Sequence, residues 1–394
     1  MGGCAPRATA TGSSASAATP EPVEISTAPM APPFRPSNEA SAEQLARTLA
    51  EGKAVQSQME WVEREEGVAS GETAAGEYLV TYVITPADDY YDLEAAQSSS
   101  PAHHTTVQPG SAHVAIVVRD AADGRAVQGL DVRVTLHSEN GGSNSAAALP
   151  FGWHPVLNRY GENMILPDGP FTLVARIGMP SYRRSDAVNG KRFSSEVTAR
   201  FADVSVSADS LAAASRRLAR GDSRESVQLA AREGATIDAQ LAAVLRGNAN
   251  GAETVSGDYR ISVVVRPERG YWEVRAGALR FVGSQQSVGP VVHVAVAIRD
   301  RATGRFIPGL RVRATLLDAR RREIDTYAMP FMWHPWSNEY GLTIADPGPG
   351  RFTMRIRAEA PSFRRYGSSA LRKFNRPIDA EVRGLSFELP VADR

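Results

Sequence analysis

Cysteine is nearly missing from this 394-residue sequence, which contains Cys4 and no other. A disulfide within the chain needs two cysteines, and a zinc site of cysteine thiolates needs several, so both are excluded. Net charge is missing too, because 44 Lys and Arg balance 44 Asp and Glu. The chain lacks the basic excess of nucleic-acid-binding proteins, and we expect no nucleic acid as a partner.

Long apolar runs and recognisable catalytic motifs are also missing. No apolar run approaches the roughly 20 residues that a membrane-crossing helix needs. The sequence contains no Gly-x-Ser-x-Gly and no phosphate-binding glycine loop, so we expect a protein that is not an enzyme. Apolar residues, at 42%, suffice for packed cores, and the length allows two ordinary domains with linkers.

The N-terminal segment, residues 1–37, is rich in Ala, Ser, Thr and Pro. Such a composition buries too little apolar surface to fold, so we predict a disordered tether. Gly2-Gly3-Cys4 at its head resembles the lipid-modified cysteine and spacer of bacterial lipoproteins, and we predict lipidation of Cys4. This interpretation requires an apolar signal segment upstream of the cysteine. The alternative is a disordered start with an incidental cysteine.

The sequence repeats itself at a spacing of 180 residues. The run HVAIVVRD from His113 returns from His293 as HVAVAIRD, and Pro-Phe-x-Trp-His-Pro occurs at 150–155 and again at 330–335. A period of this length is too long for a solenoid and indicates a duplicated domain. The two copies can therefore be compared position by position.

Each copy combines a helical segment with short β-runs. Apolar residues fall at helical spacings from Ser41 to about Glu66, and a second helical stretch covers about Ser210 to Leu245. Short apolar or alternating runs with turn signals follow each helix and favour an immunoglobulin-like β-sandwich. We predict a mainly β protein of two tandem sandwiches, each preceded by a helical segment. The predicted segments are the tether (1–37), a helical segment (38–70), the first sandwich (71–206), a helical linker (207–250) and the second sandwich (251–394).

Four of the seven histidines occupy equivalent positions in the two copies. His113 is matched by His293, and His154 is matched by His334. Neutral imidazole is a common ligand for copper, zinc and iron, and a strand with a following loop can bring two rings onto one ion. The repeated histidines therefore predict one metal site in each copy.

The two predicted sites are unequal. Met329 directly precedes the second Pro-Phe-x-Trp-His-Pro motif, whereas the first copy has Leu149 there. A thioether beside imidazoles suits Cu(I), so we expect the second copy to bind copper more tightly.

A structural interpretation of these motifs stays open. A His before Pro makes good hydrogen bonds to the backbone, and Trp153-His154-Pro155 could attach a long loop to the sandwich. Two histidines also do not complete a coordination shell. The arginine pairs 183–184 and 364–365 could grip a carboxylate or phosphate, but we expect them to form a solvated edge or to pair with local acids such as Asp186.

The order of these motifs resembles the periplasmic ferrous-iron transport protein family. Each copy carries His-Val-Ala, Gly-Leu, Asn-x-Tyr-Gly and Gly-x-Phe-Thr in that order, and Met329-Pro330-Phe331 stands between the second and third motifs of the later copy. The similarity spans roughly 78–206 and 259–389. Members of that family are small secreted sandwich proteins that bind copper and assist iron uptake.

The resemblance implies a role for some of the repeated residues. His113 and His293 match the family's strand histidine, and Met329 matches its first loop methionine. The family's loop histidine is replaced here by Arg159 and Glu339.

Two further points concern the family's ligands. His154 and His334 lie a few residues before the replaced loop histidine and could substitute for it. The acidic residue that the family has two positions after its strand histidine is alanine in both copies.

The resemblance predicts a metal-binding lipoprotein of the periplasm or outer cell surface that takes part in iron or copper acquisition or handling. Its partners would be the metal ion and a membrane iron permease. The two repeats would pair as a pseudo-dimer within one chain, as family members pair between chains. The rival hypothesis is a structural or adhesive double sandwich in which the His-Trp motif is packing, and an enzyme ranks third.

Overall fold

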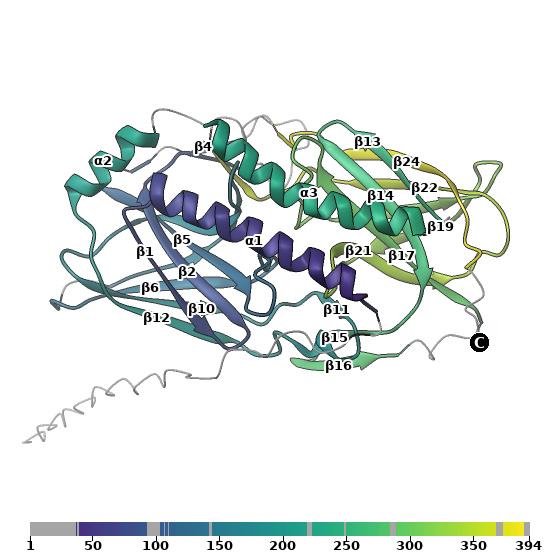
Figure 1. Ribbon diagram of the computed structural model, residues 1–394, viewed down its shortest axis with the longest axis horizontal. Coiled ribbons are helices and arrows are strands. Elements are labelled where there is room, and N and C mark those ends of the chain that lie inside the picture. Colours follow the sequence, from purple (N-terminus) through teal and green to yellow (C-terminus); the bar gives the residue numbers. More distant parts are fainter. Residues whose placement is uncertain are drawn as a thin grey trace, which may run out of the picture.

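The structure is a computed structural model. It describes residues 37, 39–92, 103–105, 107–108, 110–141, 144–218, 223–247, 250–283, 289–367 and 373–389. Cys4 and the predicted tether, apart from residue 37, lie outside this part of the chain. Within it the protein is mainly β, as predicted, and the strands form four sheets that are paired as β-sandwiches (Figure 1).

The first repeat, residues 69–206, contributes most strands of one eight-stranded and one four-stranded sheet. The larger sheet has the order β1 (Ala69–Ala75), β2 (Tyr78–Pro86), β5 (Ser111–Asp120), β9 (Arg159–Ile165), β8 (Phe151–Trp153), β23 (Arg364–Tyr366), β3 (Tyr90–Asp92) and β4 (His103–Thr105). The smaller sheet has the order β12 (Val197–Val204), β10 (Phe171–Ile177), β6 (Val132–Ser138) and β7 (Ser145–Leu149).

The second repeat, residues 250–389, is built in the same way. Its larger sheet has the order β13 (Gly251–Ser256), β14 (Tyr259–Pro267), β17 (Val291–Asp300), β21 (Asn338–Ala345), β20 (Phe331–Trp333), β11 (Arg183–Ser185), β15 (Tyr271–Arg275) and β16 (Ala278–Val282). Its smaller sheet has the order β19 (Glu323–Met329), β18 (Val312–Leu317), β22 (Phe352–Ala358) and β24 (Ile378–Leu385).

Helices cover the outer faces of the large sheets. The helices are α1 (Ala42–Glu65), α2 (Ala208–Leu218) and α3 (Arg224–Gly247), with a short 3₁₀ turn at Asn189–Lys191. Val55 and Met59 of α1 pack against Val83 and Val117 on the outer face of the first large sheet. β5 therefore packs against the sandwich core on one face and against α1 on the other, which explains why it is an almost continuous apolar run rather than an alternating one. Among the described residues, no helix combines the length and apolarity needed to cross a bilayer.

The two long helices, α1 and α3, lie side by side and antiparallel (Figure 1). Arg47 donates to Gln240 at 3.1 Å, and Gln58 donates to Glu233 at 2.8 Å. Each helix also crosses a hairpin turn of its own repeat so closely that only glycine fits at the crossing. A Cβ at Gly52 of α1 would lie 1.8 Å from a backbone oxygen of the turn. The corresponding glycine of α3 makes the same close approach, at 1.7 Å. The duplication therefore includes the helices.

The two repeats exchange a short strand. β11 of the first repeat pairs with β20 and β15 in the sheet of the second, and β23 of the second repeat pairs with β8 and β3 in the sheet of the first. The tryptophans of the repeated motif cross over as well. Trp153 packs against Phe363 and Phe374 in the second core, and Trp333 packs against Phe193 in the first. The predicted boundary between the sandwiches thus does not separate two self-contained sheets.

The arginines of the exchanged strands do not form a solvated edge. Arg183 and Arg364 pair with acidic side chains, Glu273 at 3.3 Å and Glu162 at 2.8 Å. Arg184 and Arg365 are fully buried. Their guanidinium groups donate to backbone carbonyls of the loops that follow, as in the bond from Arg365 to the carbonyl of Phe374 at 3.2 Å. Each arginine therefore closes a loop inside the protein, and neither is available to grip an external anion.

A candidate metal centre in the second repeat

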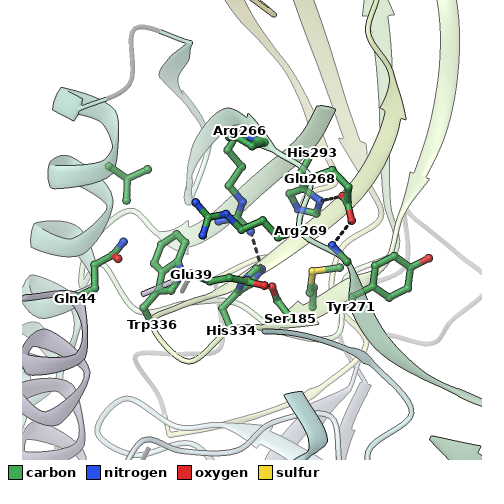
Figure 2. A pocket seen from close by; sticks show the side chains of 14 residues that line it. Glu39, Gln44, Ser185, Arg266, Glu268, Arg269, Tyr271, His293, His334 and Trp336 are labelled. Atoms are coloured by element: carbon green, nitrogen blue, oxygen red, sulfur yellow. Dashed lines mark hydrogen bonds and ion pairs between the residues drawn. The ribbon is translucent and has the colours of Figure 1, made fainter. Parts of the chain in front are cut away.

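A partly open cavity of about 170 Å³ lies at one end of the second large sheet (Figure 2). Two histidines line it, His293 from β17 and His334 from the loop after β20. Arg266 and Glu268 reach it from the end of β14, while Glu39 comes from the segment before α1. The cavity is therefore formed by residues that are far apart in the sequence.

Glu339 joins the two histidines into one group. Its Oε1 atom lies 2.7 Å from Nε2 of His293 and 3.0 Å from Nε2 of His334. One potential ligand atom from each residue lies within 4.8 Å of the other two, and all three residues are buried. Among the residues that the structure describes, this is the group of three that could hold a metal ion. Two imidazoles and one carboxylate are a common donor set for iron(II) and zinc.

A glycine makes room for the strand histidine. Gly341 of β21 lies opposite Ala295 of β17, and a Cβ there would come within 2.7 Å of both His293 Nε2 and Glu339 Oε1. Gly161 has the same relation to His113 in the first repeat, at 2.4 Å. The repeated Asn-x-Tyr-Gly motif thus carries a glycine because the ring lies directly over that strand.

A second carboxylate stands behind each histidine of the centre. Nδ1 of His293 lies 3.5 Å from Glu268, which also accepts from the Thr343 hydroxyl. Nδ1 of His334 lies 4.0 Å from Glu39 and has no hydrogen-bond partner. Carboxylates at this position orient metal-bound histidines and increase their basicity.

Glu39 is itself held in place by the exchanged strand. It accepts from the hydroxyl of Ser185 and, at 3.1 Å, from the backbone N–H of Asp186. Figure 2 shows Glu39 and Ser185 beside His334. The first repeat therefore contributes to a site that otherwise belongs to the second.

Arg266 occupies the middle of the group. One of its amino nitrogens donates to Glu339 at 2.8 Å and lies 2.7 Å from Nε2 of His334. The guanidinium also lies over the ring of Trp336, 5.1 Å from its centroid. Arg266 thus contacts the same atoms that a metal ion would use.

The surroundings shift the pKa values of the two histidines in opposite directions. Burial disfavours the charged form of His293, but hydrogen bonds to Glu268 and Glu339 outweigh it and raise the pKa of this ring. Burial lowers the pKa of His334 to about 4, with Arg266 adding to the effect against the attraction of Glu339. His334 is therefore neutral at physiological pH, the form that binds metals.

The first repeat lacks the carboxylate of this centre. Arg159 stands where the second repeat has Glu339, and it pairs with Glu66 at 3.1 Å. His154 accepts backbone hydrogen bonds on Nδ1, as from the N–H of Val156 at 3.2 Å. His113 bonds to the side chain of Asn163 at 3.1 Å. The structure thus brings His293 and His334 onto one carboxylate, whereas His113 and His154 belong to no group of three ligands among the described residues.

Met329 does not lie in the cavity. It is buried in the apolar core of the second sandwich, where it pairs with Val312 across β19 and β18. Met332 of β20 lines the cavity instead. The expectation that Met329 supplies a thioether ligand is therefore wrong, and the argument for Cu(I) that was based on Met329 falls with it.

The sequence interpretation missed most of the groups around the histidines. Glu339 was noticed only as a departure from the family's pattern, and Arg266, Glu268 and Glu39 were not considered. A charge comparison of the two copies would have marked Glu339, because Arg159 reverses its sign. Nothing local marks Glu39, which is more than 250 residues from both histidines.

The buried histidines of the first repeat predict a pH-dependent stability. Burial, with a contribution from Arg159, lowers the pKa of His113 to about 3, and burial also lowers the pKa of His154. An unfolded histidine binds a proton near pH 6.5, so acid favours the unfolded chain. The contribution of His113 is complete above about pH 6.5 and declines as the pH falls, by about 1.4 kcal/mol per pH unit.

Between pH 6.5 and 4.5 the unfolding free energy should fall less steeply in His113→Gln than in the wild type, by about 1.4 kcal/mol per pH unit. Urea unfolding at several pH values measures it. His137→Gln is the matched control, because His137 is exposed on β6. Equal slopes for the wild type and His113→Gln would contradict the prediction.

Comparisons with known proteins add little to this geometry. No protein-family model and no curated protein matches the chain. Among solved structures, the crystal structure of dimeric latent PorU from Porphyromonas gingivalis is similar at 9% identity and a TM-score of 0.17. That similarity covers 79% of this chain and 34% of the other, so the chain spans about a third of PorU. A likeness this weak carries no argument about fold or function.

Proposed function

We propose that this protein binds one divalent transition-metal ion, iron(II) or zinc, through His293, His334 and Glu339. It would serve metal acquisition or handling at a cell surface or in the periplasm, without catalytic turnover. The location follows from the resemblance of Cys4 and its spacer to a lipoprotein start. The residues of the site support the proposal of a metal ion.

One observation carries the proposal. Three buried ligand atoms from separate segments lie within 4.8 Å of one another, and each histidine has a carboxylate behind its other ring nitrogen. Buried ionisable groups are costly unless they are paired, and three of these five groups are carboxylates, against one arginine. A divalent cation supplies compensating positive charge. Two imidazoles and a carboxylate favour iron(II) or zinc over Cu(I), which prefers sulfur.

The rival is a structural double sandwich, and one observation favours it. Arg266 donates to Glu339, so the cluster has an internal cation without any metal. Trp153 and Trp333 of the repeated motif are packed in apolar cores, as that hypothesis expects. A metal titration separates the two hypotheses.

We expect one equivalent of metal per chain. The duplicated histidines alone would suggest two metal ions per chain. In the first repeat, however, the positive charge of Arg159 replaces the carboxylate ligand Glu339. Protein without a histidine tag, stripped of metal, would be titrated with iron(II) under anaerobic conditions and with zinc, by isothermal calorimetry. Two equal sites would contradict the asymmetry between the repeats. No binding of either ion would overturn the proposed function.

A further inference from the structure

We propose that the metal-loaded centre also binds a small carboxylate anion, such as bicarbonate or acetate, between the metal ion and Arg266. This inference rests on the proposed metal site and names the ligand class that completes it. Three observations support it: the cavity beside the ligands, the position of Arg266, and the existing partners of the neighbouring carboxylates.

The cavity adjoins the ligands on their accessible side. Three protein ligands leave at least one coordination position open, and both histidines line a space of about 170 Å³. A cavity of this volume has room for an anion of a few non-hydrogen atoms.

Arg266 must give up its partner when a metal binds. Its amino nitrogen lies within 3 Å of both Glu339 Oε1 and His334 Nε2, which are the atoms that the metal would take. Two cations cannot share those atoms at that distance. The backbone of Arg266 is fixed at the end of β14, and its guanidinium lies over Trp336 in the cavity wall. The displaced group therefore stays beside the open coordination position.

The other carboxylates of the cavity already accept hydrogen bonds from their own neighbours. Glu268 accepts from Thr343 and from the backbone N–H of Gly270, and Glu39 is held by Ser185 and the N–H of Asp186. A displaced, largely buried guanidinium needs a new acceptor, because an unpaired buried charge is costly. A planar carboxylate matches the fork of Arg266 with its oxygens and can share one of them with the metal.

Binding of the anion and the metal should be mutually dependent. Each supplies the charge that holds the other, so bicarbonate or acetate should increase metal affinity, and by linkage the metal should increase anion affinity by the same factor. We expect about tenfold or more, within the range typical of coupled binding sites. Neither anion should bind appreciably to the metal-free protein.

The experiment uses cobalt(II) as a coloured substitute for iron(II) in the full-length protein. Cobalt-loaded protein in carbonate-free buffer would be titrated with bicarbonate or acetate at constant ionic strength, with chloride as the control. We expect a saturable change in the visible absorption spectrum with either carboxylate and none with chloride. Cobalt-loaded Arg266→Gln should lose the response to both carboxylates, and cobalt-loaded Arg313→Gln, at an exposed position of β18, should keep it.

The outcomes separate this inference from the proposed function. If cobalt binds and the wild-type spectrum ignores both carboxylates, the anion inference fails while the metal site stands. A response in Arg266→Gln equal to that of the wild type would also overturn it. Absence of cobalt binding in every form would remove both proposals.

Discussion

Replacing Glu339 with Gln should weaken metal binding by more than about 100-fold, because losing an outer-shell partner alone typically costs about 10- to 100-fold. The carboxylate is the one charged ligand of the group, and it contacts both histidines. Gln keeps the size of the side chain but removes the charge. His334→Ala should have a comparable effect. Competition against a coloured chelator measures the affinities.

The first repeat supplies the matched controls. His154→Ala changes the position equivalent to His334, and we expect metal affinity to stay within about twofold of the wild type, because the His154 ring contacts Glu66 and the backbone N–H of Val156 rather than the ligands. Met329→Leu installs the residue of the first copy and should also leave affinity unchanged, because Met329 is in the core. Equal losses for His154→Ala and His334→Ala would show that the second repeat does not hold the metal alone.

The repetition of the sequence predicted part of the site for a physical reason. A residue kept in both copies at the same spacing occupies the same place in the same fold, so His293 and His334 were found together. The third ligand, Glu339, differs between the copies, and repetition cannot show a group that only one copy has. The strands were predictable because their apolar patterns are local.

The exchange of strands could not be predicted in the same way. β11 and β23 are three-residue strands whose local pattern is the same whichever large sheet they join. Their partners are set by how the two repeats pack, which depends on helices α1 and α3 and on both tryptophans of the repeated motif. The same packing brings Glu39 to a site in the other repeat. Contacts between residues so far apart in the sequence leave no periodic signal in it.

The exchange makes a strong prediction about stability. Arg365 is buried in β23 and donates to backbone carbonyls of Pro361, Phe363, Lys373 and Phe374 at 2.9–3.2 Å. Arg365→Ala leaves these acceptors without a donor, and we expect a loss of about 3–5 kcal/mol in unfolding free energy. Arg365→Lys should recover little of it, because an ammonium group cannot reproduce the guanidinium fork.

Urea unfolding, followed by far-UV circular dichroism and by tryptophan fluorescence, tests this. Arg383→Ala is the control, since that side chain forms an exposed ion pair with Glu381 and should change stability by less than about 1 kcal/mol. Both probes should report one coincident transition in Arg365→Ala. β23 lies between β8 and β3 of the first repeat's sheet while its loop closes in the second core, so neither repeat can lose it alone. Two separate transitions would mean that the exchanged strands do not couple the unfolding of the two repeats.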